Sequence, residues 1–211
     1  MEGRLNPALV ALVLLTAAGC GTAKPAADIA PEWRPLPTAG LAGRKVTVYP
    51  LTMIAADRAL GWDEALEDRR AALDRADSAI LATLESRAAE VLWVTPEQLR
   101  RASRRAPGLL ADPDRLALTV LAGGSVFVVP DPLRSQMRGL TGVAGDRYAL
   151  VPAGLIYRRG APDAGGEAEL RLVMTDVRTG TVGWRSTLRG TGSDPWSALR
   201  AALDSLFPGL P

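Results

Sequence analysis

The stretch Glu167-Ala-Glu-Leu-Arg-Leu-Val-Met-Thr-Asp-Val-Arg-Thr-Gly-Thr-Val-Gly-Trp-Arg-Ser-Thr-Leu-Arg189 decides the fold. Apolar and polar residues alternate in both of its halves, which predicts two strands with one buried face each, over 167–177 and 181–189. Residues 176–180 join the strands as a tight hairpin, in which Gly180 can take a positive φ. The side chains expected on the buried faces are Leu170, Leu172 and Met174 in the first strand and Val182, Trp184 and Leu188 in the second.

Three further strands are predicted upstream of this hairpin. Residues 45–51 (Lys-Val-Thr-Val-Tyr-Pro-Leu) are rich in β-branched side chains and contain a proline near their end, which indicates a first strand. Residues 91–94 form a short apolar run, which is typical of a strand buried on both faces. Residues 148–157 form the strand directly before the hairpin, and residues 53–63 are expected to be a loop.

Helices are predicted between and after these strands. Residues 64–90 carry one apolar stripe with the period of a long amphipathic helix. The sequence Thr95-Pro-Glu-Gln98 has the hydroxyl, the proline and the glutamine of a capping box, so a second helix begins there. Further helix starts are indicated by the Asp-Pro pairs at Asp112, Asp131 and Asp194, and the last of these helices has an apolar seam of Trp196, Leu199, Leu203 and Leu206.

The predicted order of elements is β-α-β-α-α-β-β-β-α over residues 44–211. Strands that alternate with helices and then run together predict one α/β (α+β) domain, in which helices pack on a mixed β-sheet. The composition supports a folded domain, since 47% of the residues are hydrophobic and 5% are aromatic.

The N-terminus is expected to be a targeting segment. An apolar run from Ala8 to Ala18 follows a head that carries Arg4, and it is too short to span a membrane, which takes about 20 residues. The run ends in Leu14-Leu-Thr-Ala-Ala-Gly-Cys20, which resembles the lipobox of bacterial lipoprotein signal peptides. That resemblance implies that residues 1–19 are removed and that Cys20 is acylated. An ordinary secretory signal, with a free cysteine left near the cut, is the alternative.

Residues 20–43 are rich in alanine, proline and glycine, which indicates a tether between the lipid and the domain. Gly21 follows the cysteine, where an aspartate commonly retains lipoproteins at the inner membrane. Its absence favours the outer membrane, with the domain facing the periplasm.

The residue types that are missing restrict the chemistry. The sequence has no histidine, and Cys20 is its one cysteine. A Ser-His-Asp or Cys-His nucleophile and a zinc site built on histidine or cysteine are therefore excluded. We expect no catalytic, cofactor-binding or metal-binding residues and no cofactor. Capping accounts for Asp112, Asp131 and Asp194, and Asp176 is expected to brace the hairpin.

The candidate binding residues are four arginines of the capped helix, which are Arg100, Arg101, Arg104 and Arg105. Arginine binds phosphates and carboxylates through two parallel hydrogen bonds, so the cluster suits anionic lipid headgroups or an acidic partner. The alternative is an ordinary solvated helix face, with cations favoured near the helix C-terminus. Nucleic acid is not an expected partner, because no aromatic side chains are interleaved with the arginines.

The order of these elements resembles a group of envelope lipoproteins. The opening strand Val46-Thr-Val-Tyr-Pro-Leu51 and the hairpin from Asp176 to Trp184 carry the resemblance, together with the strand 148–157. The group includes the lipoprotein activators of peptidoglycan synthases, the curli-secretion lipoprotein and the N-terminal domain of TolB. Leu51 stands where the group commonly has phenylalanine, and the segment 93–132 is unlike its members.

The sequence therefore predicts a lipid-anchored envelope protein without enzymatic activity, an adaptor or regulator that binds another envelope component. The resemblance implies cell-wall synthesis machinery as one such component. The alternatives are a subunit of an oligomeric secretion or transport assembly and, less in keeping with the sequence, a carboxylate-dependent glycan hydrolase.

Overall fold

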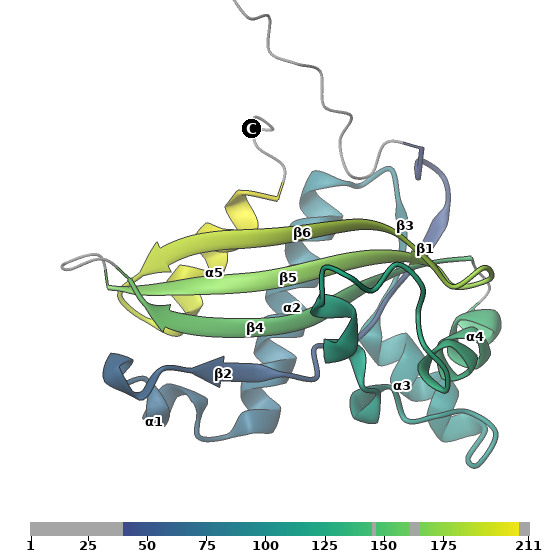
Figure 1. The fold of residues 1–211 in the computed structure, drawn as a ribbon, viewed down its shortest axis with the longest axis horizontal. Helices are drawn as coiled ribbons and strands as arrows, with labels where there is room; N and C mark the ends of the chain where they lie inside the picture. The colour runs from purple at the N-terminus through teal and green to yellow at the C-terminus, as the bar shows by residue number, and fades with distance from the viewer. Residues whose placement is uncertain (1–39, 145–146, 161–164, 207–211) are drawn as a thin grey trace, which may run out of the picture. The chain divides into compact units, whose positions relative to one another are not determined.

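The computed structural model describes residues 40–144, 147–160 and 165–206. Within these residues, one mixed sheet has its strands in the order β3-β1-β4-β5-β6, and β2 pairs with β4 (Figure 1). β4, β5 and β6 are antiparallel, whereas β1 is parallel to both of its neighbours and β2 is parallel to β4. The strands are β1 (Lys45–Val48), β2 (Ile54–Ala56), β3 (Leu92–Val94), β4 (Tyr148–Arg159), β5 (Gly166–Asp176) and β6 (Thr181–Gly192).

Helices pack on both faces of this sheet. α2 and α5 cover one face, and α3, α4 and the 3₁₀ turn η3 contribute to the core on the other. The predicted α/β (α+β) class with a mixed sheet is confirmed. The helical elements are η1 (Arg58–Leu60), α1 (Asp63–Leu66), α2 (Arg69–Arg87), α3 (Pro96–Arg105), η2 (Pro113–Arg115), η3 (Leu118–Ala122), α4 (Leu133–Ala144) and α5 (Pro195–Asp204).

The two cores follow the predicted apolar patterns. Ala76, Ile80 and Leu84 of α2 are buried in the same cluster as Leu170 and Leu172 of β5. The seam of α5 is confirmed as well, since Leu199 and Leu203 belong to this cluster. The side chains on the other face cluster separately, because a strand alternates its side chains between the two faces.

Residues 53–63 are more ordered than the predicted loop. β2 pairs with residues 155–157 of β4, and β1 pairs with residues 148–150 of the same strand. Two short strands thus share one edge of one long strand. Three residues give too short a pattern for a strand to be recognised in the sequence.

The predicted helix over 64–90 is interrupted. Asp68 accepts a hydrogen bond from the N–H of Ala71 at 2.9 Å and caps α2, while α1 ends at Leu66. An N-cap aspartate takes non-helical backbone angles, which separates the two helices despite their common apolar stripe.

The hairpin is formed as predicted, except for one side chain. Gly180 has a φ of +79°, and Asp176 accepts hydrogen bonds from the N–H groups of Arg178 and Thr179. A register shift pairs Met174 with Trp184 but Thr175 with Val182. This bulge turns Val182 toward the other face, where it packs on the second core, so the prediction for Val182 was wrong.

The expected signal peptide (1–19), Cys20 and the tether up to residue 39 lie outside the described residues. Among the described helices, none combines the length and the apolar character that crossing a membrane requires.

Candidate functional site

A groove of about 830 Å³ follows the free edge of β3. Its walls come from the C-terminal part of α2, from β3, from α3 and from the end of α4. Pockets that bind ligands usually have volumes of roughly 300–1,000 Å³. The groove is thus large enough to hold several side chains of a partner. Its larger apolar lining residues are Val91, Leu92, Trp93, Val94, Leu110 and Val143.

β3 is an edge strand, so the prediction that it is buried on both faces was wrong. It pairs with β1 and stands at the end of the sheet order. Leu92 is 54% exposed, and Val143 at the end of α4 is 62% exposed. Val91 immediately before the strand is buried. An apolar run of four residues does not distinguish an edge strand from a central one, because both need side chains that fit a pleated surface.

α3 is positioned by the predicted capping box. The Thr95 hydroxyl accepts the N–H of Gln98 at 3.2 Å, and the Gln98 side chain accepts the N–H of Thr95 at 2.8 Å. Leu99 is fully buried in the second core and fixes the rotation of the helix. Residues four apart lie on one side of a helix, so Arg101 and Arg105 both line the groove.

The four candidate arginines lie in three different environments. Arg101 and Arg105 line the groove, and the Arg101 side chain is 56% exposed. Arg104 is 63% exposed and donates to Glu97 at 3.0 Å. Arg100 is only 11% exposed and is surrounded by carboxylates. The cluster that the sequence groups together is therefore divided by the helix between the solvent and the interior.

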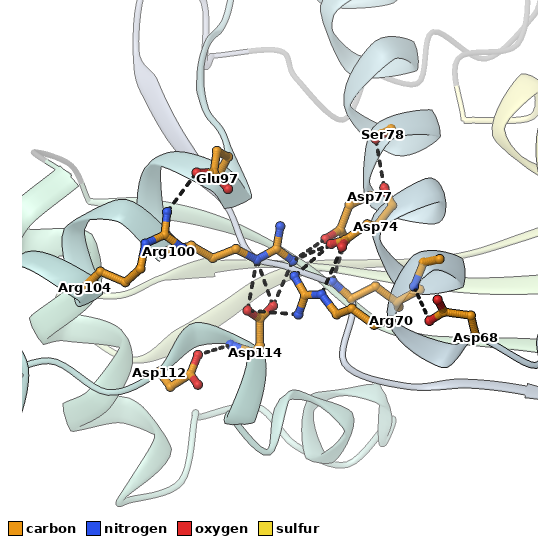
Figure 2. A network of polar contacts seen from close by, with 12 residues as sticks. Asp68, Arg70, Asp74, Asp77, Ser78, Glu97, Arg100, Arg104, Asp112 and Asp114 are labelled. Carbon is orange, nitrogen blue, oxygen red and sulfur yellow. Dashed lines mark hydrogen bonds and ion pairs between the residues drawn. The ribbon is translucent and has the colours of Figure 1, made fainter.

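Arg100 is the centre of an ion-pair network (Figure 2). Its guanidinium donates to Asp114 at 2.8 and 3.0 Å and to Asp77 at 2.8 Å. Asp74 lies 3.4 Å from the same guanidinium. Arg70 adds a second guanidinium, which lies 2.8 Å from Asp74 and 3.1 Å from Asp114. The network joins α2, α3 and η2.

Three carboxylates share two guanidinium groups in this network, and the pKa values of Asp77 and Asp114 shift in opposite directions. Burial raises the pKa of Asp77 to about 6, although a hydrogen bond from the Leu51 N–H and the nearby Arg100 both oppose the rise. Burial also acts to raise the pKa of Asp114, but its contacts with Arg100 outweigh burial and leave the pKa below the ordinary value. Asp77 is the more deeply buried of the two, which explains why burial prevails there.

Arg100 itself is held in its charged form. Burial acts to lower its pKa, but hydrogen bonds to Asp114 and Asp77 raise the pKa above the ordinary arginine value. The pKa values of Arg100 and Asp77 thus both rise. Arg100 is stabilised by several carboxylates, whereas Asp77 has to share Arg100 with them. The network fixes α3 against α2 and leaves Arg100 engaged within the fold.

The predicted capping roles of Asp112 and Asp194 are confirmed, and the one predicted for Asp131 is not. Asp112 accepts the N–H of Asp114 at 3.1 Å, and Asp194 accepts the N–H groups of Trp196 and Ser197. Asp131 accepts the hydroxyl of Ser135 at 2.9 Å. Asp112 and Asp194 thus cap helical turns through backbone N–H groups, whereas no backbone N–H of the described residues is found to donate to the Asp131 side chain. In the described part of the chain, no group of three or more acidic, histidine or cysteine side chains is arranged to hold a metal ion.

Comparisons with known proteins give limited matches. No protein-family model and no curated protein matches the chain. The LpoB C-terminal domain from Salmonella enterica is similar over 72% of this chain and 83% of that chain, with 19% identity and a TM-score of 0.37. The corresponding LpoB domain from Escherichia coli matches over 72% of this chain and 85% of its own, with 19% identity and a TM-score of 0.38.

A third similar structure is a PelC dodecamer from Paraburkholderia phytofirmans. It matches over 75% of this chain and 89% of its own, with 15% identity and a TM-score of 0.29. At these identities and TM-scores, none of the three structures assigns a function to this chain.

Sequence reasoning found two of the groove residues, Arg101 and Arg105, but missed the groove. Its floor comes from β3 and its far wall from the end of α4, about 50 residues further along the chain. The sequence contained one available signal, which is the placement of Val143 in a helix face that would otherwise be polar. The buried Asp77 was missed because it interrupts no apolar period and carries no capping signal.

Proposed function

We propose that this chain is a lipid-anchored envelope protein, attached through Cys20, that works without catalysis by binding another protein of the envelope. The single observation that carries the binding role is the groove beside β3. It joins an unpaired strand edge, exposed apolar side chains and arginines in one place. Exposed apolar side chains beside an unpaired strand edge suit contact with another protein.

The sequence supports the anchoring part of this proposal. The lipobox-like stretch ending at Cys20 is followed by a tether rich in alanine and proline. Stable attachment to a membrane takes more than one acyl chain, which lipoproteins of this type carry. The outer membrane, with the domain facing the periplasm, is the destination that Gly21 favours. A regulator of cell-wall synthesis is the sharper form of the proposal, and it rests on the sequence resemblance.

The described carboxylates favour binding over catalysis. Asp77 and Asp114 are engaged by Arg100, Asp176 braces the hairpin, and Asp194 caps α5. A pair of carboxylates for acid–base work needs one member that is protonated and open to substrate. Asp77 has a raised pKa, but it is 7% exposed and hydrogen-bonded to the backbone of Leu51.

Photo-crosslinking in living cells tests the proposal. A photoreactive amino acid replaces Val143 in the groove, and a matched chain carries it at Arg200, which is exposed on α5. We expect an adduct with one envelope protein from position 143 that is absent from position 200. An adduct of the chain with itself alone would replace the proposal with a homo-oligomeric assembly.

A second readout addresses the anchor. Metabolic labelling with an alkyne fatty acid should label the full chain and fail to label Cys20→Ser. Labelling that survives in Cys20→Ser, or a wild-type chain that takes up no label, would contradict lipid attachment at this residue.

A further inference from the structure

We infer that the groove beside β3 binds an extended, acidic segment of the partner protein, and that this segment adds to the sheet as a strand next to β3. The inference rests on the proposed function and specifies the chemistry of the partner. It combines three features of the groove, which are the free strand edge, the excess of positive charge and the apolar floor.

The strand edge supplies backbone partners. β3 is hydrogen-bonded to β1 on one side, and no strand of the described residues pairs with it on the other. An edge strand is a ready template for another extended chain, whose main chain supplies affinity and whose alternate side chains supply specificity. Since β3 is only three residues long, few main-chain bonds can form and side chains must contribute much of the affinity.

The charge around the edge selects the partner. Lys45, Arg101 and Arg105 line the groove, against the single carboxylate of Glu85. Arg101 has a loose ion pair with Glu97 at 3.8 Å, and no ion pair of Arg105 is found among the described residues. Guanidinium groups held in this way are available to carboxylates. A partner segment with carboxylates complements this surface, whereas one with lysines is repelled.

The apolar floor of the groove implies that the segment that binds there is amphipathic. Leu92 and Val143 are each more than half exposed at the groove, and Trp93, which packs partly buried against the first core, also lines it. An extended segment places successive side chains on opposite sides. We therefore expect apolar residues to alternate with acidic ones in the segment that binds.

A second copy of this chain is a poor occupant of the same groove. Edge-to-edge pairing through β3 would place two grooves with the same excess of positive charge at one interface. Like charges placed opposite each other disfavour such an interface.

The test uses two fluorescent probes and the full chain in detergent. The acidic probe is a ten-residue peptide in which valine alternates with glutamate, and the basic probe has lysine in place of glutamate. We expect the acidic probe to bind with micromolar affinity in fluorescence anisotropy and at least tenfold more tightly than the basic probe. Equal binding of both probes, or no binding of the acidic probe up to 1 mM, would overturn the inference.

Variants locate the binding site. The double change Arg101→Glu, Arg105→Glu should weaken binding of the acidic probe by about tenfold or more, because each reversal replaces an attraction with a repulsion. Arg200→Glu is the matched control, as it makes the same change on α5. Glu97→Gln should strengthen binding about twofold by releasing Arg101. Circular dichroism establishes that each variant is folded.

The strand geometry has its own control. An acidic probe with N-methyl groups at alternate residues cannot donate main-chain hydrogen bonds from those positions, so it should bind at least fivefold more weakly. Unchanged affinity would overturn strand addition. Self-association that Leu92→Lys abolishes, without peptide binding, would assign the groove to a second copy.

The outcomes separate this inference from the proposed function. If crosslinking from position 143 recovers an envelope protein but the acidic probe does not bind, the partner is recognised through different chemistry. If the acidic probe binds at the groove but crosslinking recovers no second protein, the groove has the inferred specificity and the adaptor role is wrong.

Discussion

Helix α3 carries arginines on two sides, and their surroundings are opposite. On one side, Arg100 is 11% exposed and lies against Asp77 and Asp114. On the other side, Arg101 is 56% exposed and lines an apolar groove together with Arg105. The same residue type thus holds the helix in place on one side and offers charge to a partner on the other. Burial and the number of nearby carboxylates make the difference.

The largest expected effect comes from Arg100→Ala. This change leaves the carboxylates of Asp77 and Asp114 buried or half-buried without their main partner. Breaking a buried pair by removing one member usually costs about 3–5 kcal/mol. Urea unfolding followed by circular dichroism should show a loss of this size. A loss below about 1 kcal/mol would mean that the network does not hold α3 in place.

Asp77→Asn should change how stability depends on pH. The pKa of Asp77 is about 6 in the folded chain and near 4 in the unfolded chain. Its contribution to stability is therefore fully present below about pH 4 and is lost as the pH rises through 6. Relative to Asp77→Asn, the wild type should lose roughly 2 kcal/mol between pH 4.5 and pH 7. Parallel stability curves for the two proteins would contradict the assigned pKa.

Thr95→Ala removes the cap on which both sides of α3 depend. The loss of an N-cap hydroxyl costs about 1 kcal/mol. We expect this destabilisation in urea unfolding, and Thr95→Ser should recover most of it because serine caps as well as threonine does. A serine variant as unstable as the alanine variant would indicate that packing of the threonine methyl group, and not the cap, matters.

The smallest expected effect comes from Arg105→Ala. This side chain has no ion pair among the described residues, so its removal should change the stability by less than about 0.5 kcal/mol. It should nevertheless weaken binding of the acidic probe. A variant that loses stability like Arg100→Ala would contradict the division of α3 into two sides.

The two sides of α3 also differ in how much the sequence reveals. Thr95, Pro96 and Gln98 specify the helix start, because a capping box is a local signal within four residues. The rotation of the helix depends on Leu99 and on Asp77, which lies in another helix. No local pattern distinguishes Arg100 from Arg101, so the sequence gives four equivalent candidates and the fold separates them.

The sheet shows the same limit on what the sequence reveals. The hairpin strands were predicted because apolar and polar residues alternate over 167–177 and 181–189, which is a strong signal. β2 and the edge position of β3 were not, since each strand has three residues and its neighbours come from distant parts of the chain. The groove depends on that edge, which explains why the charged half of the candidate site was predicted and its apolar half was not.

The measurement that tests the central claim most directly is crosslinking from position 143 in living cells, with and without Arg101→Glu and Arg105→Glu. We expect an adduct with one envelope protein from the wild-type groove and its loss in the charge-reversed chain, while Arg200→Glu leaves it intact. An adduct that persists at full yield in the charge-reversed chain, or no adduct from either chain, would contradict an adaptor that binds through this groove.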